Sequence, residues 1–132
     1  MISHIFLGVN DFGHAFKFYS ALMDALGLQL KFSEPEKPWA AWAAAGSARP
    51  LFLIGTPFNG NIATTGNGQM VALLAPSRDA VDRAYKQALA HGGSNEGGPG
   101  LRPEYHMDYY SAYFRDPDGN KICVCCHDPV AE

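Results

Sequence analysis

Residues 116–122 read Asp-Pro-Asp-Gly-Asn-Lys-Ile, a polar turn sequence between two segments that are rich in apolar residues. Proline restricts φ, aspartate hydrogen-bonds to the local backbone and glycine accepts a positive φ, so the segment predicts a tight turn. Residues 109–115 before it and 121–126 after it are rich in aromatic, aliphatic and cysteine residues, which is typical of strands. The sequence therefore predicts an antiparallel hairpin.

This hairpin belongs to the second of two similar halves of the chain. A shift of 66 residues places residues 4–9 on residues 70–75, and each half then begins with an alternating strand that leads into an amphipathic helix. Asp11 is the expected N-cap of the first helix, which should extend to about residue 25. Ser77 is the expected N-cap of the second helix.

After each helix the sequence is mostly extended, with turns marked by proline and glycine. The expected strands of the first half are residues 28–33, 39–45 and 51–54. Residues 94–108 are rich in glycine and proline, and we expect a loop there that holds one short strand. The pattern predicts a βαβββ unit in each half.

Composition limits the classes of function. The chain has 132 residues, a net charge of −3 and 47% apolar residues, which suits one compact domain with a small-molecule partner. Lys and Arg are not clustered, so neither nucleic acid nor a membrane surface is an expected partner. No apolar run approaches the ~20 residues of a membrane span. The three cysteines lie within residues 123–126, too close for good disulfide geometry, so a cytoplasmic location is expected.

With these elements in place, the chain resembles the vicinal oxygen chelate superfamily, which includes glyoxalase I, bleomycin resistance proteins and extradiol dioxygenases. The motifs that carry the resemblance are Ile2-Ser3-His4-Ile5, Val9-Asn10-Asp11, Phe18-Tyr19, Leu26-Gly27-Leu28, Gly66-Asn67-Gly68 and Asp116-Pro117-Asp118-Gly119-Asn120-Lys121-Ile122.

The resemblance implies an α+β fold in which two βαβββ modules form a curled mixed sheet around a shared cleft, with the helices outside. It implies a single glyoxalase-like domain over residues 1–132, with module one at 1–55, a linker at 56–68 and module two at 69–128. Because members of the family commonly pair modules across subunits, it also implies a homodimer.

Metal-dependent members of the family place His or Glu at four positions that point into the cleft. Carried over to this chain, these positions are His4, Phe52, Met70 and Cys123. Only His4 is a usual ligand for a hard divalent ion, since Phe52 cannot coordinate and Met70 is a soft thioether. A catalytic metal usually needs three protein ligands, so we expect no bound metal and no other cofactor.

The cysteines allow a second interpretation. Alternation along the last strand places Cys123 and Cys125 on one face, and the resemblance would bring that face to His4 and Met70. These four side chains could form a soft site for Zn²⁺ or Cu(I). The alternative is that the cysteines are simply buried in the packing, which is common for this residue type.

The segment 101–110 combines several chemically useful side chains in one expected loop. Arg102 is a candidate for binding an anionic group, and His106 or Tyr110 could act on the ligand or hydrogen-bond to it. Glu104 is a further titratable residue of this loop. The alternative is a tyrosine-rich strand that packs on its neighbour, with the charged residues exposed.

The leading hypothesis is a metal-independent protein that binds a small molecule in an apolar and aromatic cleft. The candidate ligand-binding residues are His4, Phe6, Phe52, Met70, Arg102, His106, Tyr110, Cys123 and Cys125. The alternative is a metal-dependent lyase, isomerase or dioxygenase of the same superfamily with altered ligands. Its weak catalytic candidates are His4, Glu104, His106 and Tyr110. A third possibility is a scaffold whose cleft has no ligand.

Overall fold

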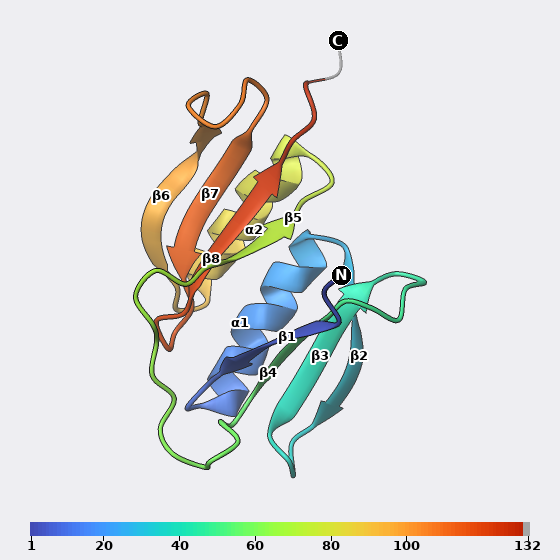
Figure 1. Ribbon diagram of the computed structural model, residues 1–132, viewed down its shortest axis with the longest axis vertical. Helices are drawn as coiled ribbons and strands as arrows, with labels where there is room; N and C mark the ends of the chain where they lie inside the picture. Colours follow the sequence, from blue (N-terminus) through green and yellow to red (C-terminus); the bar gives the residue numbers. More distant parts are fainter. Residues whose placement is uncertain (131–132) are drawn as a thin grey trace.

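The computed structural model describes residues 1–130 and shows eight strands and two helices within them (Figure 1). In chain order these elements are β1 (His4–Gly8), α1 (Phe12–Ala25), β2 (Leu28–Glu34), β3 (Trp39–Ala44), β4 (Leu51–Gly55), β5 (Val71–Leu74), α2 (Arg78–Ala90), β6 (Ser94–Leu101), β7 (Tyr110–Arg115) and β8 (Lys121–Cys126). Within these residues, neither helix has the length and apolar character required to cross a membrane.

The strands form two mixed sheets of four, one from each half of the chain. Sheet A has the order β1-β4-β3-β2 and sheet B has the order β5-β8-β7-β6. In each sheet the first strand of the half pairs in parallel with the last, and the other pairs are antiparallel. The prediction of two βαβββ modules is confirmed.

Both predicted helix caps are present. The Asp11 carboxylate accepts a hydrogen bond from the backbone N–H of His14 at 3.1 Å, and the Ser77 hydroxyl accepts one from Ala80 at 3.1 Å. Gly27 follows the first helix with a φ of 74°, a left-handed conformation that residues with a Cβ rarely adopt. Local sequence therefore fixes where the helices start and end.

One hydrophobic core joins the two modules. The helices α1 and α2 pack against each other, and each covers one face of the sheet of its own module (Figure 1). The core cluster contains residues from both modules, including Phe18, Leu22 and Trp42 from module one and Val81 and Phe114 from module two.

The opposite face of each sheet carries no helix. Outer face A includes His4, Phe6, Trp39, Leu51, Leu53 and Gly55, and outer face B includes Leu74, Ser111, Tyr113, Lys121, Cys123 and Cys125. Among the described residues, no Cα atom of β1–β4 lies within 8 Å of one of β5–β8. The two sheets therefore do not close around a cleft within one chain.

The hairpin turn at residues 116–120 connects module two to module one. The buried carboxylate of Asp116 accepts hydrogen bonds from the backbone N–H groups of Asp118 and Asn120, each at 2.9 Å, and from the Tyr19 hydroxyl at 2.5 Å. Asn120 in turn donates to the carbonyl of Gly8 at 3.1 Å. The turn sequence thus satisfies its own backbone and also fixes the position of α1.

The strand β6 is longer than the short strand expected from the sequence. It spans eight residues, although its sequence is Ser-Asn-Glu-Gly-Gly-Pro-Gly-Leu. It lies at the edge of sheet B, pairs only with β7, and shows register shifts between Asn95 and Gly100. Edge strands tolerate proline and glycine because one side of the ladder needs no partner.

Candidate functional site

Outer face B is built around two neighbouring thiols. Strand alternation directs Ile122, Val124 and Cys126 into the core, so Cys123 and Cys125 lie on the opposite face. Both are buried, with exposed fractions of 0% and 4%. The structure thus places these two predicted site residues side by side.

Two tyrosines cover Cys123. Tyr113 is paired with Cys123 across the β7–β8 ladder, and its hydroxyl is hydrogen-bonded to that of Tyr109 at 3.0 Å. The Tyr109 hydroxyl also lies 3.5 Å from the Cys123 sulfur. Burial and these hydrogen bonds raise the pKa of Tyr109, so its phenol remains protonated and can donate.

The surroundings of Cys123 favour the thiolate. Hydrogen bonding with the Cys125 thiol contributes most, and the hydroxyls of Tyr109 and Tyr113 and the charge of Arg102 add to it. Together they lower the pKa of Cys123 to about 7, although burial opposes the shift. The same interaction raises the pKa of Cys125. Cys123 is therefore the member of the pair that ionises first.

Two cations lie near the ring of Tyr113. The Arg102 guanidinium lies 5.7 Å and the Lys121 amine 5.8 Å from the ring centroid, distances typical of cation–π contacts. Arg102 also donates to the carbonyl of Gly98 at 2.6 Å. Neither cation forms an ion pair with a carboxylate within residues 1–130. Outer face B is therefore positively charged.

Outer face A differs in character, because it is aromatic and apolar. Phe6 is 44% exposed, and a Cβ at Gly55 would lie 3.2 Å from its ring, so the glycine gives the ring room. Trp39 packs on Phe32 with ring centroids 4.8 Å apart, and its indole N–H is buried without an acceptor in the described part of the chain. His4 is exposed on the same face, and its Nδ1 lies 2.9 Å from the Ser3 hydroxyl.

Two predicted ligand-binding residues lie elsewhere. Phe52 contacts the ring of Tyr19 in the core, because the β1–β4 ladder pairs Ile5 with Phe52 and His4 with Leu51. A difference of one residue along a strand reverses the face, so the expectation that Phe52 lines a cleft with His4 is wrong. Tyr110 also points toward the helices, and donates a hydrogen bond to Asp82 of α2 at 2.6 Å.

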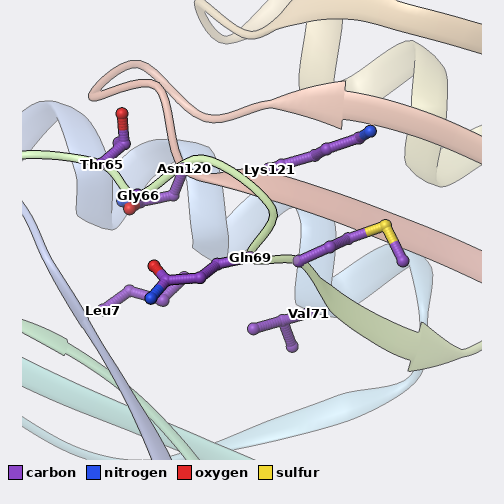
Figure 2. A pocket seen from close by; sticks show the side chains of 8 residues that line it. Leu7, Thr65, Gly66, Gln69, Val71, Asn120 and Lys121 are labelled. Atoms are coloured by element: carbon purple, nitrogen blue, oxygen red, sulfur yellow. The ribbon is translucent and has the colours of Figure 1, made fainter.

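The remaining candidates are dispersed. Met70 precedes β5 and, together with Leu7 and Lys121, borders a cavity of about 40 Å³ between the modules (Figure 2). This volume suits one or two water molecules and no organic ligand. In Figure 2 the Lys121 side chain extends away from Leu7. Glu104 is exposed.

His106 and His127 form a pair that the sequence does not reveal. Their rings stack, and Nε2 of His106 lies 2.8 Å from Nδ1 of His127. Nε2 of His127 lies 3.7 Å from the Cys125 sulfur, so the pair adjoins outer face B. Tyr109, Ser111, Tyr113 and Lys121 were also absent from the predicted site. Strand alternation could have identified them once the register of the hairpin was known.

The residues present do not fit the divalent metal ion that the resemblance implies. Of the four family positions only His4 carries a usual donor, and the structure places Phe52 in the core. Among the residues that the structure describes, no three His, Cys, Asp or Glu side chains are arranged to hold a metal ion. The soft site of His4, Met70, Cys123 and Cys125 is not assembled within residues 1–130, because His4 and the two cysteines do not form such a group.

Comparisons with known proteins agree with this fold. Residues 1–124 match the family model described as Glyoxalase/Bleomycin resistance protein/Dioxygenase superfamily. The chain is similar to the glyoxalase/bleomycin resistance protein from Albidiferax ferrireducens T118, with 38% identity, a TM-score of 0.85, and coverage of 97% of this chain and 99% of that chain. No curated protein matches the sequence.

Two more distant structures share the fold. A glyoxalase-related enzyme from Fulvimarina pelagi has 19% identity and a TM-score of 0.70, with 96% of this chain and 87% of that chain covered. Lactoylglutathione lyase from Agrobacterium tumefaciens has 23% identity and a TM-score of 0.61, with 96% and 92% covered. At such identities the likeness concerns the fold alone.

Proposed function

The chain belongs to the glyoxalase/bleomycin resistance protein/dioxygenase superfamily, and from this we propose that it binds a small organic molecule without a metal ion. The binding cleft forms between outer face A of one copy of the chain and outer face B of a second copy. The assembly is a homodimer in which each copy supplies half of each cleft.

The observation that carries this proposal is that neither helix covers an outer face in the described part of the chain, while each face exposes a large apolar side chain. Outer face A exposes Phe6, and outer face B exposes Leu74 to 69% of its surface. Large apolar side chains that are exposed on such a face support a contact with a partner or a ligand. A two-fold axis pairs face A of each copy with face B of the other copy. Both contacts then form at once, and the assembly closes as a dimer without a free face.

The proposed cleft needs no metal to bind a ligand. Outer face A contributes aromatic surface, and outer face B contributes hydroxyl and cationic donors in fixed positions. Binding sites for small molecules combine apolar walls with a few polar groups that orient the ligand. Three free thiols also fit the reducing cytoplasm that we propose as its location.

Light scattering tests the dimer with matched charge insertions. Leu74→Lys places a charge on outer face B, and Leu89→Lys places the same charge on an exposed site of α2. We expect a dimer for the native chain and for Leu89→Lys, and a monomer for Leu74→Lys. A native monomer, or identical behaviour of the two variants, contradicts the assembly.

The neutral dye Nile red tests ligand binding, with and without a chelator. We expect dye fluorescence that survives chelation and that Leu74→Lys abolishes. Elemental analysis of the purified protein gives an independent answer. About one metal ion per chain, together with dye binding lost on chelation, supports the metal-dependent lyase, isomerase or dioxygenase instead.

A further inference from the structure

We propose that outer face B recognises an anionic group of the ligand, a carboxylate or a phosphoryl group, through Arg102 and Lys121, which both lie near the ring of Tyr113. The inference rests on the proposed function, because it assigns a chemical class to the ligand of the same cleft. The ligand it describes has an apolar body against outer face A and an anionic end against outer face B.

The first step concerns the position of Arg102, which the glycines of β6 make possible. A Cβ at Gly100 would lie 2.9 Å from one terminal nitrogen of the guanidinium, and a Cβ at Gly97 would lie 3.5 Å from the other. The guanidinium thus lies against a backbone that side chains would otherwise cover. The carbonyl of Gly98 and the ring of Tyr113 hold it there before any ligand arrives.

The second step concerns charge. Arg115 is paired with Glu96 at 2.6 Å and Arg78 approaches Asp108 at 3.8 Å, whereas Arg102 and Lys121 have no such partner in the described part of the chain. The bond to Arg115 is the main cause of the lowered pKa of Glu96, and the charge of Lys121 contributes least, so this carboxylate belongs to Arg115. A guanidinium has five N–H donors in a fork that matches carboxylate and phosphoryl oxygens. One hydrogen bond from Arg102 to Gly98 leaves most of them free.

The third step concerns the neutral groups around the two cations. The hydroxyls of Tyr109 and Tyr113 lie on this face, and the buried Ser111 hydroxyl has no hydrogen-bond partner of good geometry within residues 1–130. None of the residues by which outer face B is defined is a carboxylate, and Glu96 of β6, which interacts with Lys121, is already bonded to Arg115. The lowered pKa of the neighbouring Cys123 thiol is a further sign that this face stabilises negative charge.

The test compares three probes of similar shape by isothermal titration: benzoate, phenylphosphonate and the neutral benzamide. Variants Arg102→Gln and Lys121→Gln remove the two charges, and Arg83→Gln removes a charge from an exposed site on α2 as the matched control. Circular dichroism verifies that each variant is folded.

We expect at least one of the two anions to bind about tenfold or more tightly than benzamide, and this preference to weaken as salt is added. Arg102→Gln and Lys121→Gln should each reduce anion binding about tenfold and leave benzamide unchanged, while Arg83→Gln changes neither. Equal binding of all three probes, or equal effects of Arg102→Gln and Arg83→Gln, overturns the inference. If Nile red still binds in that case, the proposed function stands; if Nile red binding is absent as well, both fail.

Discussion

At the scale of single residues, Asp116 shows how a turn residue supports the whole fold. The residue is 3% exposed, and its carboxylate accepts hydrogen bonds from two backbone N–H groups, from the Asn120 side chain and from the Tyr19 hydroxyl. A buried carboxylate is tolerable only when its oxygens are satisfied in this way. Burial and the neighbouring Asp116 charge raise the pKa of Tyr19, which keeps the phenol protonated as the donor.

We therefore expect Tyr19→Phe to lower the free energy of unfolding by about 1.5–3 kcal/mol, the usual contribution of a hydrogen bond to a charged group. Tyr85→Phe is the matched control, because it removes an exposed hydrogen bond to Asn95, and its loss should be about 1 kcal/mol or less. Urea denaturation measures both. Equal losses in the two variants would show that the buried Tyr19–Asp116 hydrogen bond stabilises the fold no more than the exposed Tyr85–Asn95 hydrogen bond.

A second residue-scale prediction concerns the Cys123 thiol. A lowered pKa means that the thiolate appears at lower pH than for an ordinary cysteine, so ultraviolet absorbance of the thiolate should rise around pH 7. Cys123→Ser should abolish this step. Cys126→Ser, which changes the thiol on the core side of β8, should retain it. A step that disappears in Cys126→Ser, or a native chain without thiolate at neutral pH, contradicts the assignment.

At the scale of elements, the backbone of β6 packs against a side chain of the loop that follows it, that of Arg102. Its glycines leave a bare backbone surface, and Arg102 occupies that surface between the strand and Tyr113. The glycine-rich composition that makes β6 look like a loop in the sequence is therefore what leaves room for the Arg102 guanidinium beside this strand.

Adding one methyl group to β6 tests this support. A Cβ at Gly100 would meet the Arg102 guanidinium at 2.9 Å, whereas the nearest atom to a Cβ at Gly98 is 4.0 Å away, at the Tyr85 hydroxyl. We expect Gly100→Ala to weaken benzoate binding to a degree similar to Arg102→Gln, and Gly98→Ala to leave it unchanged. Titration calorimetry measures both. Equal benzoate binding by the two variants would contradict the idea that Gly100 gives room to the Arg102 guanidinium.

At the scale of the whole molecule, two modules share one core and one turn. The helices pack against each other, Asn120 bonds to the Gly8 carbonyl, and the backbone N–H of Asn10 donates to Asp118 at 3.0 Å. We therefore predict that residues 1–132 behave as one domain in unfolding, although the sequence repeats.

The distribution of residue types gives each module its own probe. Both tryptophans, Trp39 and Trp42, lie in module one, and all three cysteines lie in module two. Tryptophan fluorescence and thiol labelling should therefore report the same denaturant midpoint if the modules unfold together. Two separated midpoints would show that the modules are independent.

What the sequence alone determined is the local structure: the two helices with their caps, the hairpin turn and the repeated βαβββ order. Each of these follows from periodicity and turn chemistry over a few neighbouring residues, and the structure confirms them. The two cysteines on one face of β8 belong to the same class, since alternation within a single strand is enough to pair them.

Only the tertiary structure decided which side chains meet across strands and whether the sheets meet at all. Phe52 lies in the core, and Tyr113, Lys121 and Arg102 gather at Cys123, because strand register depends on pairing between distant segments. The packing of α1 on α2, which joins the two modules, was likewise decided by the tertiary structure. Helix packing of this kind depends on the summed burial of many side chains, which no single motif in the sequence records.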